Sequence, residues 1–350
     1  MILAAIALLL LLLTIAHYFG SVRRYRVDVP YALMETLRTP DGARIELRRL
    51  PGDVIGDRPP VLCVHGIAID HRNNDMLESL SIARALRATG REVWLLTLRS
   101  GIEDLSWRER RLVRFDAMAR YDVPIAVREV ITRTGAPAID YVGFSMGGML
   151  LYAALGRTIE VASIRRVVIL GSPGKMVPPL RIVSALARVP RWMVPGAPLR
   201  IASRMIAFVA EWMGTPIHSL VYNRRNVARG VTGAALMTIR DIAQPLMADF
   251  AGFFADEGTV RFEGNASLEG LAHVRIPVRF FAGAGDLVAP PEAVRAAFDA
   301  WGAAEQGVDK AFTVLAAKEH GADYGHGDLA IGQNLARDVF TPAIAFLDAP

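Results

Sequence analysis

Short apolar runs and helix-length amphipathic stretches alternate along most of this 350-residue chain. Each run is rich in Val, Ile and Leu and ends in small or polar residues. Such runs are typical of strands buried on both faces, and a strand followed by a helix-length segment favours a right-handed crossover to a parallel neighbour. The pattern therefore predicts an α/β protein with a mostly parallel sheet and helices on both faces. The first four runs are PPVLCVHG (59–66), REVWLLTLRS (91–100), AIDYVGFS (138–145) and IRRVVILGSPG (164–174).

Two local signals predict where particular elements begin and end. In TLRTPDGARIELRRLP (36–51), Asp41-Gly42 lies between two strand-like runs, which is a strong hairpin signal. Further on, we expect a helix that has Asp122 as its N-cap and Pro124 in its first turn, and that ends at Gly135.

The alternation stops between about residues 175 and 275, where the chain is helical in composition but interrupted by prolines. An insertion of about a hundred residues is too long for an ordinary loop, so a helical cap is the simpler interpretation. Strand and helix signals resume with IPVRFFAGAGD (276–286). The sequence thus predicts a core in two parts, 21–174 and 276–350, with the cap inserted at 175–275.

The chain begins with an uninterrupted apolar stretch from Ile2 to Ala16, followed by an aromatic edge and then by Arg23, Arg24 and Arg26. A helix that spans a bilayer needs about 20 mostly apolar residues. A secretory signal normally has a positive region before its apolar run, and here there is none. We interpret residues 1–20 as a single-pass membrane anchor, with a cleaved signal peptide as the alternative. The arginine cluster favours a cytoplasmic position for the rest of the chain.

Charge and cysteine content narrow the classes of partner. Forty basic and 35 acidic residues give a net charge of +5, and the charges are interspersed. This balance argues against nucleic-acid binding and fits contact with an anionic membrane surface. Cys63 is the chain's one cysteine, so no intramolecular disulfide can form, and its apolar neighbours predict that it packs in the core.

The sequence GFSMG (143–147) lies where an apolar strand gives way to a helix. Glycines two residues before and after the serine allow a sharp bend at which strand and helix approach closely. Such a bend lifts the hydroxyl above the sheet edge and points the first N–H groups of the helix toward it. We therefore predict Ser145 as a nucleophile, with the backbone N–H groups of Met146 and Ile67 as oxyanion donors.

A serine hydroxyl needs a general base, which is itself oriented by a carboxylate. Asp286 follows a predicted strand, and His320 and His326 lie in a glycine-rich loop before the last helix. All three follow Ser145 in the order that an α/β-hydrolase requires, which is serine, acid, histidine. His65 precedes the serine and is predicted to be a structural residue of the oxyanion loop.

These motifs resemble those of the α/β-hydrolase superfamily, and within it the acid lipase group, which cleaves cholesteryl esters and triacylglycerols. The resemblance covers about residues 59–346 and implies an α/β-hydrolase fold with a helical cap. It also implies Ser145 as nucleophile, Asp286 as acid and His326, rather than His320, as base. The stretches that carry it are FDAMARYDVP (115–124), GAGDLVAPPEAV (283–294) and HGDLAIG (326–332).

The chain departs from that group around the serine. Phe144 stands where the group usually has histidine, and Met146 and Gly148 also differ. Polyhydroxyalkanoate synthases share the wider similarity but have cysteine as nucleophile, so Ser145 points to hydrolysis rather than polymerisation.

Two further clusters have simpler interpretations. His320, Asp323, His326 and Asp328 offer metal-ligand atoms, but no partner cluster lies elsewhere, so we expect no metal and predict that Asp328 caps the last helix or fixes the loop. The large apolar residues of the insertion are predicted to form the cap's own core, with membrane contact as the alternative. These are Trp192, Met193, Met205, Phe208, Trp212 and Met213.

The sequence as a whole predicts a membrane-anchored serine hydrolase that cleaves lipid or other apolar acyl esters through a Ser-His-Asp triad and an acyl-enzyme, without a cofactor. The same triad suits a thioesterase, an amidase or an acyltransferase, because the bend at the serine does not fix the leaving group. A non-catalytic, membrane-tethered binding protein on the same fold is the other alternative.

Overall fold

Strands from both parts of the predicted core form one eight-stranded sheet in the computed structural model, which describes residues 2–50, 58–178, 188–213 and 220–349. The order is β1-β2-β4-β3-β5-β6-β9-β10; β1 pairs antiparallel with β2 and β2 with β4, and the pairings from β4 to β10 are parallel. The predicted parallel sheet and the hairpin at Asp41-Gly42 are confirmed. The strands are β1 (Leu33–Arg38), β2 (Arg44–Arg49), β3 (Val61–Val64), β4 (Val93–Thr97), β5 (Ile139–Phe144), β6 (Ile164–Leu170), β9 (Val278–Gly283) and β10 (Lys310–Leu315).

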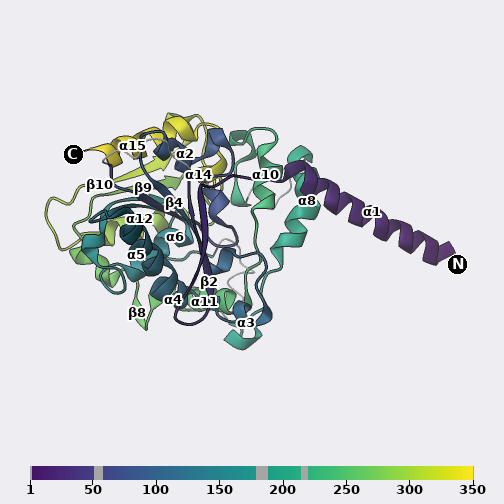
Figure 1. The fold of residues 1–350 in the computed structure, drawn as a ribbon, viewed down its shortest axis with the longest axis horizontal. Coiled ribbons are helices and arrows are strands. Elements are labelled where there is room, and N and C mark those ends of the chain that lie inside the picture. Colours follow the sequence, from purple (N-terminus) through teal and green to yellow (C-terminus); the bar gives the residue numbers. More distant parts are fainter. Residues whose placement is uncertain (1, 51–57, 179–187, 214–219, 350) are drawn as a thin grey trace.

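Helices cover both faces of the sheet, so the central strands are buried on each side (Figure 1). In β3, Leu62 and Val64 pack with one layer of helices, while Val61 and Cys63 pack with the other. This explains why the strands are continuous apolar runs, and it confirms the core position of Cys63. The first layer contains α5 (Val123–Thr134), α6 (Met146–Ala154) and α12 (Pro291–Ala300), and the second contains α2 (Ile82–Arg87) and α15 (Thr341–Asp348).

Shorter helices complete the core and connect its layers. The predicted last helix consists of two α-helical pieces, α14 and α15, with a π-helical turn at Ala336–Phe340 before α15. The other short helices are α3 (Trp107–Arg110), α4 (Phe115–Ala117), α13 (Ala317–His320) and α14 (Asp328–Ile331).

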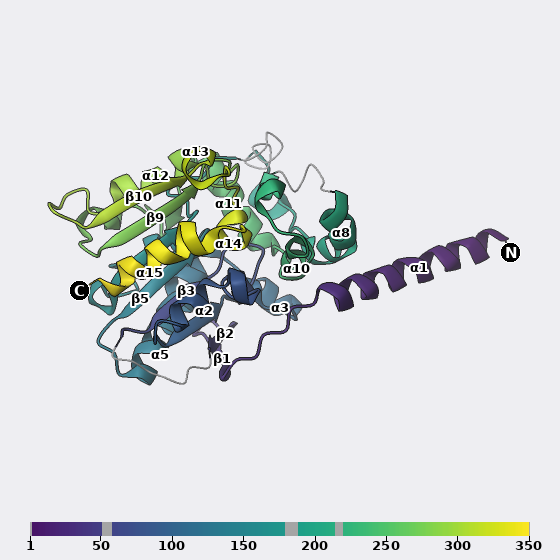
Figure 2. The ribbon, with the colours of Figure 1, turned by 90° about the horizontal axis from the view of Figure 1, so that it is seen from above.

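The segment between β6 and β9, where the cap is predicted, is largely helical. Its helices at residues 199–213 and 231–237 lie at the end of the body from which α1 (Ile2–Tyr25) projects (Figure 2). The division into core and cap at residues 175 and 275 stays a prediction. The elements of this segment are α8 (Leu199–Met213), α10 (Val231–Met237), α11 (Gln244–Ala255) and a small hairpin of β7 (Arg261–Phe262) and β8 (Asn265–Ala266).

The prediction that the large apolar residues of this segment form its core is wrong for most of them. Helix α8 instead buries the small residues Ser203, Ala207 and Ala210, because it packs closely against α10. Its large apolar side chains therefore face outward. Phe208, Trp212 and Met213 of this helix are exposed, and so are Trp192 and Met193, which precede it in the chain.

The prediction of Asp122 as an N-cap is also wrong. A π-helical turn at Met118–Asp122 leads directly into α5, so Asp122 lies within helical backbone, and its side chain accepts no N–H group of α5. Its carboxylate is fully buried and accepts hydrogen bonds from the guanidinium of Arg99 at 2.7 and 2.9 Å. The other predictions for this helix are confirmed: Pro124 lies in its first turn and Gly135 ends it in the left-handed conformation, with φ of 68°.

Replacing Arg99 by methionine should lower the free energy of unfolding by about 3–5 kcal/mol, because it leaves Asp122 buried without its cation. The lost bonds to Asp41 in the β1–β2 turn add to this effect. Urea denaturation measures the change. As a matched control, Arg133→Met removes partly exposed pairs with Glu35 and Glu129 and should cost less than about 1 kcal/mol. Equal losses in the two variants would contradict the buried-pair assignment.

Candidate active site

The bend between β5 and α6 places Ser145 in a strained conformation. Its φ and ψ are 51° and −120°, which is uncommon for a residue with a side chain. Such a conformation costs about 1–3 kcal/mol and persists only where the surroundings impose it. The backbone N–H of Ser145 is held by the carbonyl of Leu170 on β6 at 2.8 Å. This hydrogen bond to β6 therefore holds the bend in place at the edge of the sheet.

The two glycines of GFSMG are required by contact, as predicted. A Cβ on Gly143 would lie 2.8 Å from the Cα of Gly148, and one on Gly147 would lie 2.4 Å from the carbonyl oxygen of Val64. Both distances are far inside van der Waals contact, and both contacts are with backbone atoms, which cannot rotate away. With any residue other than glycine at these two positions, α6 could not approach β3 and β5 so closely.

Ser145, His326 and Asp286 converge at the carboxyl edge of the sheet. The Oγ of Ser145 lies 2.9 Å from Nε2 of His326, and Nδ1 of His326 lies 2.7 Å from Oδ2 of Asp286. The other carboxylate oxygen of Asp286 accepts the N–H groups of Val288 and Ala289 at 2.8 and 2.7 Å. The carboxylate holds the proton on Nδ1, so Nε2 is free to accept the serine proton. All three residues are at most 7% exposed.

His320, the competing histidine, lies elsewhere. Its Nδ1 is 3.2 Å from a carboxylate oxygen of Asp338, an ion pair when the ring is protonated. Asp323 accepts the N–H of Ala317 at 2.8 Å. In the described ranges, no three His, Cys, Asp or Glu residues gather as metal ligands would.

Asp328 fixes the loop that carries His326, which is one of its two predicted roles. It accepts the N–H of Gly325 at 3.1 Å, and it also accepts the backbone N–H of Asn223 at 2.9 Å and the side-chain amide of Asn226 at 3.1 Å. Burial raises its pKa to about 6. Because Asn223 and Asn226 belong to the segment between β6 and β9, this carboxylate ties the base loop to the predicted cap.

The two predicted oxyanion donors flank the serine. Met146 is the first residue of α6, and its N–H has no partner within that helix. Ile67 follows Gly66, whose Cα packs against the nucleophile: a Cβ there would lie 2.9 Å from the Cβ of Ser145. Neither N–H donates to another backbone carbonyl in the described part of the chain. Both groups are therefore available to a ligand at this position.

His65 has the structural role that its place before the serine predicted. It is fully buried; its Nε2 accepts the N–H of Leu98 at 3.1 Å and its Nδ1 donates to the carbonyl of Gly66 at 2.8 Å. Burial lowers its pKa to about 4. A neutral ring with both nitrogens bonded within the fold serves to hold the oxyanion loop.

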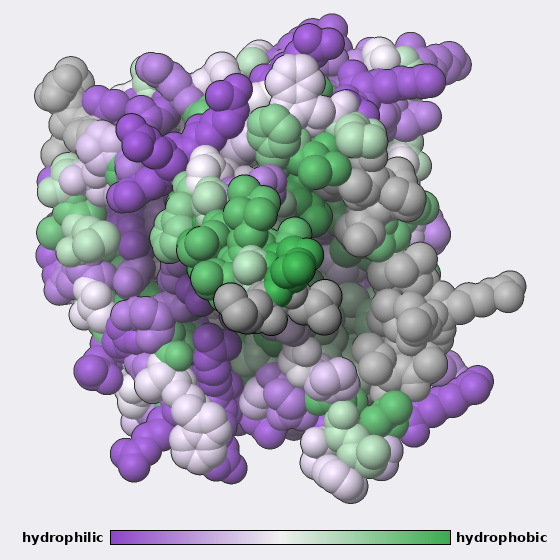
Figure 3. All heavy atoms as spheres, turned by 90° about the vertical axis from the view of Figure 1, so that its right-hand side faces the viewer, coloured by the Kyte–Doolittle hydropathy of each residue, from purple (hydrophilic) through white to green (hydrophobic). Residues whose placement is uncertain are grey.

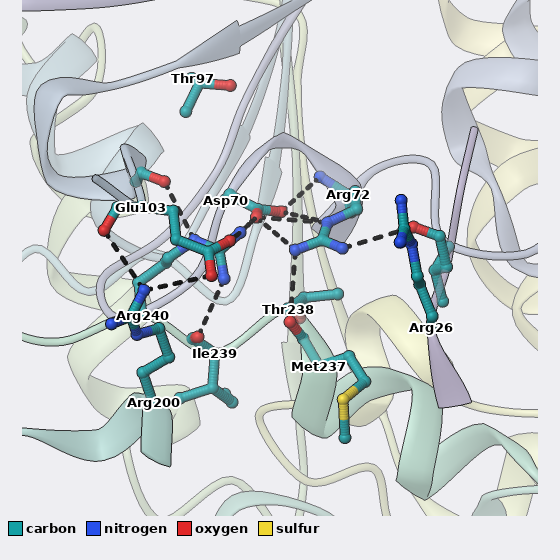
Figure 4. A network of polar contacts seen from close by, with 12 residues as sticks. Arg26, Asp70, Arg72, Thr97, Glu103, Arg200, Met237, Thr238, Ile239 and Arg240 are labelled. Atoms are coloured by element: carbon teal, nitrogen blue, oxygen red, sulfur yellow. Dashed lines mark hydrogen bonds and ion pairs between the residues drawn. The ribbon is translucent and has the colours of Figure 1, made fainter. Parts of the chain in front are cut away.

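A network of ion pairs centred on the buried Asp70 and Arg240 holds the same loop from its other end (Figure 4). Asp70 pairs with Arg72 at 2.8 Å and with Arg240 at 2.6 Å, and Arg240 also pairs with Glu103 at 3.1 Å. Burial alone would raise the pKa of Asp70, yet the neighbouring ring of His71 and the guanidinium groups of Arg72 and Arg240 hold it below its ordinary range. Arg204 of α8 reaches Glu103 at 2.8 Å and so joins that helix to the network.

The backbone of Arg240 adds a direct bond to the oxyanion loop. Its N–H donates to the carbonyl of Ala68 at 2.8 Å, and Ala68 itself has a positive φ of 59°. Sequence reasoning missed this network, because charged residues in connecting segments have the same appearance whether they are paired and buried or solvated.

Comparisons with known proteins agree with this architecture. A family model described as alpha/beta hydrolase fold matches residues 59–326. Human gastric triacylglycerol lipase is 29% identical over 141 residues, which is 35% of this chain and 34% of that protein. A putative lysosomal acid lipase/cholesteryl ester hydrolase of Crotalus adamanteus is 30% identical over 137 residues, 35% of this chain and 34% of the relative. These matches thus span about a third of each curated relative.

Solved structures show the same fold over almost the whole chain. An esterase from Exiguobacterium antarcticum matches with a TM-score of 0.60 at 15% identity, covering 91% of this chain and all of the other. A thermophilic esterase from Thermogutta terrifontis matches with a TM-score of 0.54 at 18% identity, covering 90% and 98%.

We expect stability to fall as the pH drops below 6.5, the ordinary pKa of histidine. Burial holds the pKa of His65 at about 4 and that of His71 at about 3, so the unfolded chain binds protons there that the folded chain does not. The stabilisation is complete above pH 6.5 and is lost between pH 6.5 and 4 for His65, and between pH 6.5 and 3 for His71. His65 alone accounts for about 3 kcal/mol. Denaturation across this range measures the slope, which His65→Gln should reduce; an unchanged slope would contradict the assignment.

Proposed function

This chain belongs to the α/β-hydrolase family, and we propose that within it the protein is a serine hydrolase of carboxylic esters. The observation that carries the proposal is the hydrogen-bonded series from Ser145 through His326 to Asp286, set on a strained bend at the carboxyl edge of the sheet. Serine, base and orienting carboxylate in this arrangement suit acyl transfer.

The proposed reaction proceeds through an acyl-enzyme. His326 accepts the Ser145 proton as the Oγ attacks the ester carbonyl, and the N–H groups of Met146 and Ile67 hold the oxyanion that develops. The protonated imidazole, stabilised by Asp286, then gives its proton to the leaving alkoxide. Water activated by the same imidazole releases the acid and restores the serine. The chain's own residues supply each of these roles, so the proposed mechanism uses no cofactor.

We further propose that the acyl group is that of a lipid or another apolar acid. Two curated relatives, named as a triacylglycerol lipase and an acid lipase/cholesteryl ester hydrolase, support this substrate class.

The membrane is the second part of the proposal. The described residues include an N-terminal helix that is long and apolar enough to cross a bilayer. Its last turns are built into the fold: Nε2 of His17 lies 2.8 Å from the carbonyl of Met205, and the ring of Tyr25 lies against Gly233, where a Cβ would be 2.4 Å from it. Cleavage as a signal would remove these contacts, so we favour an anchor. Arg23 and Arg24 at its end favour a cytoplasmic body.

Replacing Ser145 by alanine should reduce turnover of p-nitrophenyl esters by about 10³-fold or more and abolish fluorophosphonate labelling, because the nucleophile is lost. His326→Gln should cause a loss of similar size. His320→Gln is the matched control, since that ring pairs with Asp338 and not with the serine; its turnover should stay within about twofold. Normal turnover in Ser145→Ala, or equal losses in both histidine variants, would contradict the site.

A series of p-nitrophenyl esters of rising acyl length tests the substrate class. An apolar acyl site should give kcat/KM values that rise by up to about tenfold for every two methylene groups while the chain is being buried. A maximum at acetate or butyrate would contradict the lipid assignment, while absence of turnover at every length would favour a binding protein.

A further inference from the structure

Helix α8 has an apolar face that points away from the body. The outward residues recur at separations of three, four and seven along the helix, so they lie on one side of it, while small residues occupy the opposite face. An exposed apolar stripe of this kind marks a surface that contacts another apolar phase. The stripe consists of Ile201, Phe208, Val209, Trp212 and Met213, which are 59%, 46%, 41%, 60% and 73% exposed.

The position of α8 relative to α1 indicates what that phase is. In both ribbon views α8 runs across the direction of α1, at the end of the body from which α1 projects (Figures 1 and 2). It touches α1 at the level of His17 and Tyr18, through the carbonyl of Met205 and the guanidinium of Arg204. The apolar stretch before His17 is about 22 Å long, against a bilayer core of about 30 Å. A chain anchored by α1 therefore has α8 at the depth of the membrane surface.

A basic cleft opens between the ends of α1 and α8. It has a volume of about 450 Å³ and includes the guanidinium groups of Arg24, Arg224 and Arg229 beside Trp212. Within the described ranges, none of these three arginines pairs with a carboxylate. Glu211 is the acidic residue of the lining, and its two oxygens are engaged by the N–H groups of Gly230 and Gly233. The cleft thus has cations available for an anionic ligand.

A second large basic cavity differs on this point. It includes Arg72 and Arg240, but the carboxylates of Asp70 and Glu103 already neutralise them in the network described above. Charge alone therefore does not single out the cleft at the end of α1; the lack of acidic partners does.

We propose that the α8 stripe and the arginine cleft together form a docking surface for an anionic phospholipid bilayer. The apolar side chains enter the boundary between acyl chains and headgroups, and Arg24, Arg224 and Arg229 bind lipid phosphates. Trp212 lies at the junction, where an aromatic ring suits the membrane interface. The proposal rests on the membrane anchor of the proposed function. Figure 3 views this end of the molecule with α1 pointing toward the viewer, so the apolar side chains of that helix occupy the middle of the picture.

Site-specific fluorescence tests the docking surface in the full chain. Cys63 is completely buried, so an introduced exposed cysteine can be labelled selectively. An environment-sensitive fluorophore is attached to the cysteine of Val209→Cys, on the stripe, or of Ala303→Cys, the matched control. Residue 303 lies in the turn after α12, and α12 lies far from α1. Each protein is reconstituted into vesicles of phosphatidylcholine, with and without phosphatidylglycerol.

In phosphatidylglycerol vesicles the label at residue 209 should shift to shorter wavelength and brighten, while the label at residue 303 should not change. Arg224→Ser and Arg229→Ser should each lower the ratio of docked to undocked label about fivefold, the equivalent of about 1 kcal/mol per arginine near an anionic surface. The double variant should lose most of its preference for phosphatidylglycerol, and the remainder should be that of Arg24. Phe208→Ser should weaken the shift in both.

Flotation on a density gradient and turnover of a soluble ester, measured on the same samples, separate the possible failures. If the chain does not float with vesicles, the anchor is wrong and the docking surface falls with it, whether or not the ester is cleaved. If the chain floats and the label at residue 209 emits as it does in water, the anchor stands and the docking surface is overturned. A shift that follows the protein-to-lipid ratio, and not the phosphatidylglycerol content, would assign the stripe to a second copy and overturn the proposal.

Discussion

The structure depends first on how closely α6 approaches the sheet. With Gly147 seated against the carbonyl of Val64 and Gly143 against the backbone of Gly148, the chain has one way to turn from β5 into α6, and Ser145 takes the positive φ. Every residue of α6 from Met146 to Ala154 is buried, and each buried leucine contributes about 1.5–3 kcal/mol. That burial offsets the strain of about 1–3 kcal/mol at the serine. The packing of an entire helix therefore maintains the direction of one hydroxyl toward His326.

Buried polar contacts then place the loops around this hydroxyl, and they join those loops to the predicted cap. Asp328 connects the His326 loop to Asn223 and Asn226, and Arg240 connects the oxyanion loop to the region after α10. Water is largely excluded from both contacts, so breaking either would leave a buried charge without its partner. The proposed general base and the proposed oxyanion loop are thus held by the same segment, and a displacement of that segment would disturb both.

The sequence was sufficient to predict the structure where a local pattern is compatible with one structure. Strands buried on both faces read as continuous apolar runs, and the ends of parallel strands meet at one edge, so Ser145 and Asp286 were expected to be neighbours. It was insufficient where the partner is distant. Asp122 before Pro124 has the same pattern whether it caps a helix or pairs with Arg99, and only the fold brings Arg99 to it. The periodicity of α8 shows that its two faces differ, but not that the small residues are the buried ones.

Packing contacts and hydrogen bonds form a continuous path from the proposed membrane anchor to the candidate active site. Tyr25 at the end of α1 packs on Gly233 of α10, and beyond that helix Arg240 holds Ala68 and Asp70 on the oxyanion loop. No flexible linker interrupts this path in the described residues, since α1 itself contacts both α8 and α10. The direction of α1 therefore fixes how the carboxyl edge of the sheet is presented to a bilayer. With the proposed lipid ester as substrate, this rigid attachment limits the orientations in which Ser145 meets the ester carbonyl, and so lowers the entropy cost of each encounter.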